Sequence, residues 1–391
     1  MKPDELKLSE LKLKAAERAT LRLRGIYQKY GYRKFRMGRF EEYSLYAANA
    51  DFLKGDKVIT FTDLDGRLLA MKPDVTLSII KNSRATKDSS EKFYYIENVY
   101  REDKESNNFR EVSQMGLEYI GNVDNYGVTE VLLLAARTLE EIDEEYILEI
   151  SNMEYVTELL GSMNLSYDDY VHMLMLIRQK NIDGIRKVGA GIGLRKENIE
   201  ILAQIPTLYG NVDETIKRAR KLVMNTPMAD ALDQLRDVCA ALKVMGASDK
   251  VQLDLSIVND IDYYNGIIFT GFIKRLAVNV LSGGQYDRAM KIFGRRVGAV
   301  GFALYLDEIS RLEREKEEFD IDALILYEEG TKPDKVAEAV NAVMRQGLSV
   351  HADSCVPEGL RYGKKFTLEE AYALNEAAAG SGEKSDGKEG A

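Results

Sequence analysis

The sequence Glu111-Val112-Ser113-Gln114-Met115-Gly116-Leu117-Glu118-Tyr119-Ile120 predicts a β-strand with two polar side chains on one face. Gln114 and Glu118 are an even number of positions apart, so a strand directs both toward the same side of its sheet. The sequence at 92–96 predicts another strand. Residues 101–108, between these two strands, are polar and predict a loop of the kind that carries function.

Two more strands are predicted nearer the N-terminus, at residues 58–62 and 67–71. They flank Asp63-Leu64-Asp65-Gly66, a hairpin turn with glycine where a positive φ is needed. Strands joined by hairpins, rather than by regular helical crossovers, indicate an antiparallel sheet. We therefore expect an α+β fold rather than a doubly wound one.

The other elements follow from hydrophobic periodicity. Steps of three or four predict helices at 11–30, which should stop at Gly31, and at 125–145. Residues 153–248 are helical almost throughout and read as an inserted helical block. The remaining predicted elements are strands at 146–151, 251–257, 267–273 and 277–281 and a final helix that begins near Val300.

A charge run at 313–318 marks the expected end of a first domain, residues 1–312. Residues 313–375 should then form a small α/β module. Its predicted elements are a strand at 321–327, a helix at 333–346 and a strand from Leu348. Residues 376–391 lack hydrophobic patterning, so we expect a disordered tail there.

The composition disfavours several functional classes. The 391 residues include 64 acidic and 54 basic side chains, and the net charge of −10 argues against a general nucleic-acid binder. Two histidines and two cysteines are too few for a histidine-rich metal centre or a disulfide framework. No run approaches the roughly 18–20 apolar residues of a membrane span, and the charged N-terminus is unlike a secretory signal. We expect a cytoplasmic protein without a metal or a cofactor.

Four short motifs follow one another in the chain. They are Met71-Lys72-Pro73-Asp74-Val75-Thr76; Tyr100-Arg101-Glu102 with Phe109-Arg110-Glu111 and Gln114-Met115-Gly116-Leu117-Glu118; Asp262-Tyr263-Tyr264-Asn265-Gly266; and Ser282-Gly283-Gly284-Gln285-Tyr286-Asp287 with Gly298-Ala299-Val300-Gly301-Phe302-Ala303. Gly283 and Gly284 do not open a helix in a βα unit, so we expect a strand-end turn there rather than a phosphate-binding loop.

In this order the motifs resemble the catalytic core of histidyl-tRNA synthetase and of its non-synthetase relative, the regulatory subunit of ATP phosphoribosyltransferase. The resemblance covers about residues 5–312. It implies a class II synthetase-like fold, with an antiparallel sheet flanked by helices. It also implies a dimer that forms through the first helix and the first motif. The helical block at 153–248 lies where synthetase relatives carry an insertion.

The polar residues of these motifs allow two interpretations. Gln114 and Glu118, with Asp74 nearby, suit an ammonium group and an imidazole N–H, or they satisfy a buried network with Arg101 or Arg110. The resemblance implies the first, because three of these residues match positions that hold the amino group and the ring of histidine. Two tyrosines match the aromatic wall of that pocket. The predicted ligand-binding set is Asp74, Thr76, Arg101, Gln114, Glu118, Tyr263 and Tyr264.

Departures from the family pattern predict that adenylation is lost. Arg101 stands at the motif 2 position, but Glu308 replaces an arginine expected near the ATP phosphates, where arginine stabilises charge. Asn259-Asp260-Ile261 stands in place of the histidine-specific catalytic arginine, and Gly38 in place of the motif 1 proline. Only about sixty patterned residues follow the core, fewer than an anticodon-binding domain needs, so tRNA recognition is not expected.

The resemblance therefore implies a non-catalytic regulatory subunit of ATP phosphoribosyltransferase. Such a subunit activates the short-form catalytic subunit in the first step of histidine biosynthesis, within a hetero-octamer of four regulatory and four catalytic chains. It also mediates feedback inhibition by histidine. Two alternatives stay open at this point, a divergent histidyl-tRNA synthetase with enzyme activity and a free-standing histidine sensor.

Overall fold

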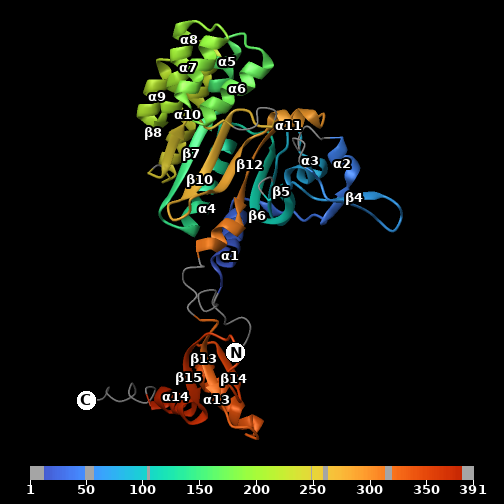
Figure 1. Ribbon diagram of the computed structural model, residues 1–391, viewed down its shortest axis with the longest axis vertical. Coiled ribbons are helices and arrows are strands. Elements are labelled where there is room, and N and C mark those ends of the chain that lie inside the picture. The colour runs from blue at the N-terminus through green and yellow to red at the C-terminus, as the bar shows by residue number, and fades with distance from the viewer. Residues whose placement is uncertain are drawn as a thin grey trace, which may run out of the picture. The chain divides into compact units, whose positions relative to one another are not determined.

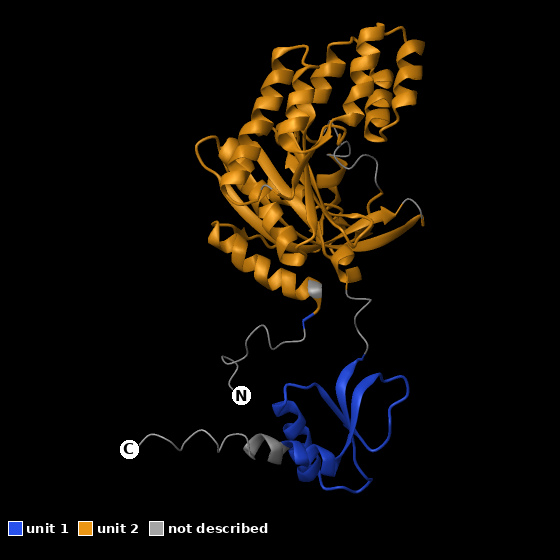
Figure 2. Ribbon diagram, turned by 90° about the vertical axis from the view of Figure 1, so that its left-hand side faces the viewer, with its two compact units in different colours: residues 1–13, 313–391 blue, residues 14–312 orange. Residues whose placement is uncertain are grey.

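The computed structural model describes residues 13–48, 57–103, 106–247, 249–258, 263–312 and 319–380. The chain divides into two compact units, shown in different colours in Figure 2. The larger unit comprises residues 14–312. The smaller comprises residues 313–391 together with residues 1–13.

A nine-stranded sheet forms the centre of the larger unit (Figure 1). From edge to edge its strands are β1 (Arg33–Lys34), β5 (Glu91–Asp103), β6 (Asn108–Gly121), β12 (Gly298–Tyr305), β11 (Asn279–Gln285), β10 (Ile267–Ile273), β7 (Tyr146–Asn152), β9 (Val251–Asp254) and β8 (Tyr209–Gly210). Neighbouring strands are antiparallel except for the pairs β1–β5 and β7–β9. The predicted α+β fold with a mainly antiparallel sheet is confirmed.

Alternation along β6 separates the two faces of this sheet. Met115 and Leu117 are fully buried in the main hydrophobic core, to which α1 (Ala15–Lys29) and α4 (Asn125–Ile142) also contribute. Gln114, Gly116 and Glu118 project from the opposite face, because successive side chains of a strand alternate. The predicted polar face is therefore the one that α1 and α4 leave uncovered.

Local sequence sets the ends of the two covering helices. α1 is followed by Gly31, whose φ of +82° suits glycine and ends the helix as predicted. α4 is capped at its start by Asp124, whose carboxylate accepts a hydrogen bond of 2.8 Å from the backbone N–H of Gly127.

The predicted hairpin at 58–71 is present, but it belongs to a separate sheet. β3 (Thr60–Thr62) and β4 (Leu68–Met71) are antiparallel, with Gly66 at a φ of +85° in the turn. β2 (Phe40–Glu42) pairs with the other edge of β4. Two short helices accompany this three-stranded sheet, α2 (Tyr43–Ala47) and α3 (Thr76–Asn82). The chain thus runs from this hairpin directly to Asp74 and the start of α3.

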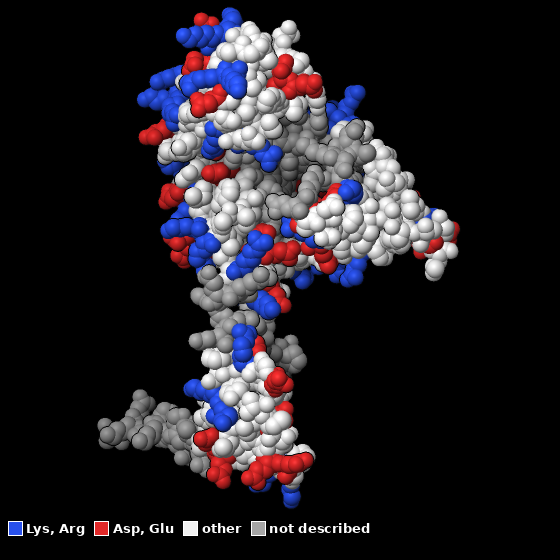
Figure 3. All heavy atoms as spheres, viewed as in Figure 1, with Lys and Arg blue, Asp and Glu red and all other residues white. Residues whose placement is uncertain are grey.

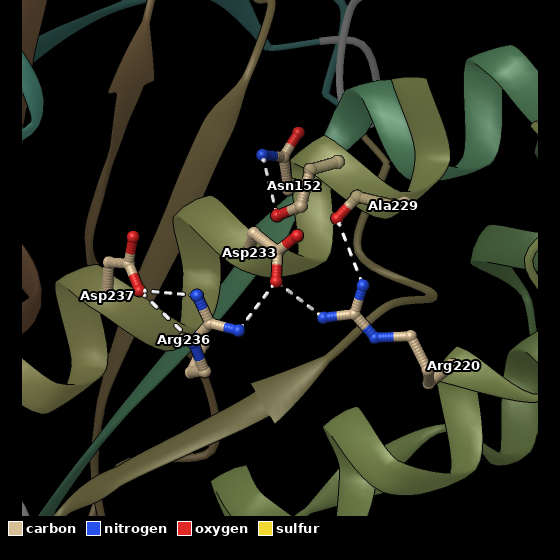
Figure 4. Close-up of polar contacts among 7 residues, drawn as sticks. Asn152, Arg220, Ala229, Asp233, Arg236 and Asp237 are labelled. Carbon is tan, nitrogen blue, oxygen red and sulfur yellow. Dashed lines mark hydrogen bonds and ion pairs between the residues drawn. The ribbon is translucent and has the colours of Figure 1, made fainter. Parts of the chain in front are cut away.

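The block at 153–248 is helical as predicted. Its elements are α5 (Met153–Gly161), α6 (Tyr167–Arg178), α7 (Ile182–Gly191), α8 (Lys196–Gln204), a 3-10 turn (Ile205–Thr207), α9 (Val212–Arg220) and α10 (Thr226–Val244). β8 interrupts it with a short strand at the sheet edge. Figure 4 shows Asp233 of α10 between two arginines, 2.6 Å from Arg220 of α9 and 2.7 Å from Arg236.

Three local predictions are wrong, and each concerns a strand. The polar segment at 101–108 mostly extends β5 and β6, with a positive-φ turn at Asn107. The helix expected from Val300 is the strand β12, and helix resumes only in α12 (Leu306–Ile309). Gly283 and Gly284 lie inside β11 rather than in a strand-end turn.

The ends of other strands differ by a few residues from the predicted ones. β9 stops at Asp254, short of the predicted Ile257, and β11 starts at Asn279. The remaining elements of the larger unit are α11 (Asp287–Ile292) and a 3-10 turn (Ser310–Leu312). The charge run at 313–318 lies outside the described residues.

The C-terminal unit is a three-stranded parallel sheet in the order β14-β13-β15 with its own core. Its elements are β13 (Ile321–Leu326), α13 (Pro333–Arg345), β14 (Val350–Asp353), β15 (Tyr362–Thr367) and α14 (Leu368–Gly380). The first three match the predicted module. The tail prediction is wrong for residues 376–380, because α14 continues to Gly380, and residues 381–391 lie outside the described residues.

Charged side chains of both signs are interspersed over the insertion helices on the face shown in Figure 3. Within the described residues, no helix combines the length and apolar character that crossing a membrane requires.

Candidate functional site: a tyrosine-lined cavity on the open face of the sheet

A cavity of about 250 Å³ lies on the polar face of the nine-stranded sheet. All seven residues of the predicted set line it, although they come from four separate segments of the chain. They are Asp74, Thr76, Arg101, Gln114, Glu118, Tyr263 and Tyr264. The sequence therefore identified residues that the fold brings together.

Strand register explains how three central strands shape this cavity. Glu118 of β6 lies opposite Gly301 of β12, and Gln114 lies opposite Tyr305. A Cβ at position 301 would lie 1.8 Å from Glu118 Oε2, so only glycine leaves room for that carboxyl group. Likewise, a Cβ at Gly116 would lie 2.4 Å from the hydroxyl of Tyr95. The glycines of the motifs thus make space for polar side chains above the sheet.

Glu118 is the most perturbed acid in this cavity. It is buried, and its two oxygens accept hydrogen bonds from the hydroxyls of Thr76 (2.9 Å) and Tyr286 (2.6 Å). Burial, together with the nearby Asp74 carboxylate, raises the pKa of Glu118 to about 8, although the two hydroxyls partly offset that shift. Glu118 therefore holds a proton at neutral pH unless a cation lies against it.

Asp74 is fixed by the backbone and by an arginine. Its carboxylate accepts from the N–H of Leu77 (3.0 Å), in the first turn of α3, and pairs with Arg101 Nη2 (3.4 Å). Arg101 Nε also donates to the carbonyl of Pro73 (2.9 Å). The alternative network is wrong for Glu118, because Arg101 pairs with Asp74 and the Glu118 carboxyl is held by hydroxyls.

Gln114 carries a donor without a partner. Its side chain is 2% exposed, and its Nε2 makes no hydrogen bond within the described residues. A buried amide left unpaired costs free energy, so such a group generally marks a position where a ligand or water supplies the acceptor. Gln114 lines the cavity four residues from Glu118, so the two define opposite ends of its β6 wall.

Tyrosines form most of the apolar wall. The rings of Tyr263 and Tyr264 lie 4.4 Å apart between centroids, and Tyr263 lies 5.6 Å from Tyr286. Tyr95 and Tyr305 also line the cavity. Aromatic faces next to buried carboxyl groups attract a cation. The predicted set lacks Tyr95, Tyr286 and Tyr305, although Tyr286 lies within the motif at 282–287.

A buried ion pair anchors the segment that carries Asp74. Lys72 is 1% exposed, and its Nζ lies 2.5 Å from a carboxylate oxygen of Glu97 on β5. The carbonyl of Lys72 accepts from the N–H of Tyr100 at 3.0 Å. β5 thus holds the chain immediately before Pro73 and Asp74, which fixes the acid against the sheet.

The residues that departed from the family pattern lie away from this cavity or outside the described chain. Glu308 sits on α12, does not line the cavity, and lies 2.5 Å from Arg311. Gly38 lies in irregular chain between β1 and β2. The segment Asn259-Asp260-Ile261 and the following Asp262 fall outside the described residues.

A mainly antiparallel sheet with helices on one face and a motif-lined polar cavity on the other defines the class: this is a class II synthetase-like core. The family model for histidyl-tRNA synthetase matches residues 7–309. The chain therefore belongs to the histidyl-tRNA synthetase family, and its resemblance to the regulatory subunits within that family is confirmed by curated relatives.

One such relative is the ATP phosphoribosyltransferase regulatory subunit of Thermoanaerobacter sp. (strain X514). It is 28% identical, over 81% of this chain and 85% of its own length. A solved Bacillus halodurans structure, described as an ATP phosphoribosyltransferase regulatory subunit/histidyl-tRNA synthetase, has a TM-score of 0.74 at 23% identity and covers 90% of this chain and 93% of that one. A chain of the ATP phosphoribosyl transferase complex of Thermotoga maritima has a TM-score of 0.59 at 20% identity, covering 73% and 96%.

Proposed function

We propose that this chain is a non-catalytic regulatory subunit of ATP phosphoribosyltransferase. It activates the short-form catalytic subunit in the first step of histidine biosynthesis and transmits feedback inhibition by histidine. The observation that carries this proposal is the match to curated relatives of that name over more than four-fifths of both chains. The Thermotoga maritima complex, which has a chain of the same fold, supports a catalytic partner.

Histidine is the ligand that suits the cavity. An imidazole lies against the buried Glu118 carboxyl, its ring covered by Tyr263 and Tyr264, and an ammonium group reaches Asp74. Gln114 offers its unpaired amide donor to an acceptor on the same ligand. Feedback then requires histidine to bind one state of the assembly more tightly than another, a coupling that is reciprocal between ligand and partner.

The cavity is poorly equipped for ATP chemistry. Among the described residues that line it, the cations are Arg101 and Lys57. Arg101 pairs with Asp74, and Lys57 Nζ lies 2.5 Å from Glu102. A triphosphate needs several cations whose charge is available to it. This supports a subunit that retains amino-acid binding without adenylation.

Further parts of the proposal follow the family. The subunit forms a dimer and joins four catalytic chains to make a hetero-octamer of four plus four in the cytoplasm. It does not act on tRNA, in keeping with the interspersed charges over the insertion in Figure 3.

Calorimetric titration with histidine tests the ligand. Glu118→Ala removes the buried carboxyl group and should abolish measurable binding, while Glu200→Ala, which alters an exposed pair with Arg186, should leave the affinity unchanged. Unchanged affinity in a folded Glu118→Ala variant would remove histidine from this cavity.

The family match itself favours one alternative, an active histidyl-tRNA synthetase. That enzyme would show histidine-dependent exchange of pyrophosphate into ATP, whereas the proposed subunit shows none. A free-standing sensor would bind histidine but would not co-elute with the catalytic subunit in size-exclusion chromatography.

A further inference from the structure

Tyr305 reaches across the end of the cavity that lies away from Glu118. It is the last residue of β12 and lies opposite Gln114, whereas Glu118 lies opposite Gly301. Its hydroxyl is 2.6 Å from the hydroxyl of Ser282 on β11. Tyr305 therefore joins two strands through side chains at the Gln114 end.

The register shows where the Tyr305 ring must lie. Ser282 is opposite Ala303, not Tyr305, so the ring leans back along β12 to reach it. It passes over Ala303, whose small side chain leaves room. Burial, and next the Tyr305 phenol, raise the pKa of Tyr264, which agrees with a Tyr305 ring turned toward that wall.

The other residues in the cavity-facing row of β12 have small side chains. Gly301 and Ala303 precede Tyr305 on the cavity side of the strand, and all three line the cavity. Phe302 of β12 also borders the cavity, but it belongs to the main core on the other face of the sheet, so Tyr305 is the large side chain of this row in the described chain. The cavity volume of about 250 Å³ is below the 300–1,000 Å³ usual for sites of drug-sized ligands.

We propose that the ring of Tyr305 determines ligand size: it admits a free amino acid and rejects one that is extended beyond its carboxyl carbon. This inference rests on the proposed histidine site. With the imidazole at Glu118, the carboxyl end of the ligand points toward Gln114 and Tyr305. A group added at that end meets the Tyr305 ring, whereas a group as small as an amide does not.

A matched pair of ligands isolates size from charge. Histidinamide and N-benzyl histidinamide are equally charged and differ by one aromatic group on the carboxamide. Calorimetry with the full chain should show that the wild type binds the benzyl compound at least about 30-fold more weakly than histidinamide, a discrimination that pocket shape can supply. Comparable affinities for both ligands would overturn the proposal.

Variants at Tyr305 then identify the residue responsible. Tyr305→Ala should reduce the discrimination to about threefold or less, whereas Tyr305→Phe keeps the ring and should still reject the benzyl compound. Tyr305→Leu serves as a milder truncation should the alanine variant fail to fold. Rejection by a truncated variant that binds histidinamide normally would contradict the role of Tyr305.

The two proposals fail in different ways. If the wild type binds neither histidine nor histidinamide, the histidine site is wrong and the size limit falls with it. If histidine and histidinamide bind but the benzyl compound binds equally well, the histidine site stands and only the role of Tyr305 is lost.

Discussion

Glu118 makes the stability of the protein depend on pH in a direction opposite to that of most acids. Its pKa is about 8 in the folded chain, against 4.5 for an ordinary glutamate side chain. The folded state therefore binds a proton more tightly between these two values, so the free energy of unfolding falls as pH rises from about 4.5 to 8. Most buried acids that are paired with cations show the reverse.

Glu118→Gln should remove this dependence. The neutral amide has the same shape and keeps partners in Thr76 and Tyr286. The free energy of unfolding of the variant, relative to that of the wild type, should therefore rise by about 3–5 kcal/mol from pH 5 to pH 8.5. Denaturant unfolding at both pH values measures the difference. Glu200→Gln, at an exposed site, should follow the wild type, and parallel curves for the wild type and Glu118→Gln would contradict the buried proton.

Gly301→Ala tests the space that glycine leaves for Glu118. The added Cβ would overlap the carboxyl group, so we expect a loss of about 1–3 kcal/mol in stability and a loss of histidine binding. Gly25→Ala is the control, because it lies in α1 with nothing within 4 Å and should gain about 0.5–1 kcal/mol. A Gly301→Ala variant as stable as the wild type would show that Glu118 is not confined there.

At this scale the sequence predicted the cavity residues well, because motif order and strand parity are local signals. Gln114 and Glu118 share a face by spacing alone, and Asp74 precedes a helix start. The place of Tyr305 in the cavity could not be predicted, because a helix from Val300 would direct its side chain differently from the strand that is present. The Arg101–Asp74 pair was equally out of reach, because pairing between distant segments depends on the fold.

Within the elements, apolar packing rather than ion pairs holds the insertion together. Leu232 and Asp233 are neighbours on α10. Leu232 is fully buried, whereas the side chain of Asp233 is 40% exposed and pairs with Arg220 and Arg236 (Figure 4). Leu232→Ala should cost about 2–5 kcal/mol, and Asp233→Ala should cost about 1 kcal/mol or less.

Urea unfolding followed by far-ultraviolet circular dichroism compares these two variants. Equal losses would mean that the arginine pairs contribute as much as the core. The pairs are also exposed to salt, so any Asp233→Ala effect should shrink at high ionic strength while the Leu232→Ala effect persists.

The element-scale errors have physical causes. β12 is central and buried on both faces, so Val300 and its neighbours lack the polar alternation that distinguishes a strand from a helix. The extension of β5 and β6 through 101–103 and 108–110 is polar because the hairpin there is largely accessible to solvent, and exposed strands resemble loops in composition. The helices of the insertion were predicted correctly because their periodicity is long and regular.

The whole molecule comprises two units with separate cores. The main core draws on residues of 14–312, and the C-terminal core on residues such as Ala323, Ile325 and Val343. We expect a chain that ends at Leu312 to fold and to bind histidine within about threefold of the full chain, since a unit with its own core can fold alone. Calorimetry and circular dichroism check this, and lost binding in a folded truncation would place part of the site in the C-terminal unit.

The central claim is regulation of a catalytic partner, and the initial rate of phosphoribosyl-ATP formation tests it most directly. The short-form catalytic subunit is assayed alone, with this chain, and with this chain plus histidine. We predict activation of about tenfold or more, within the range of coupling between sites, and its reversal by histidine. Glu118→Ala should activate but resist histidine. A rate unchanged by the folded wild-type chain would contradict the account.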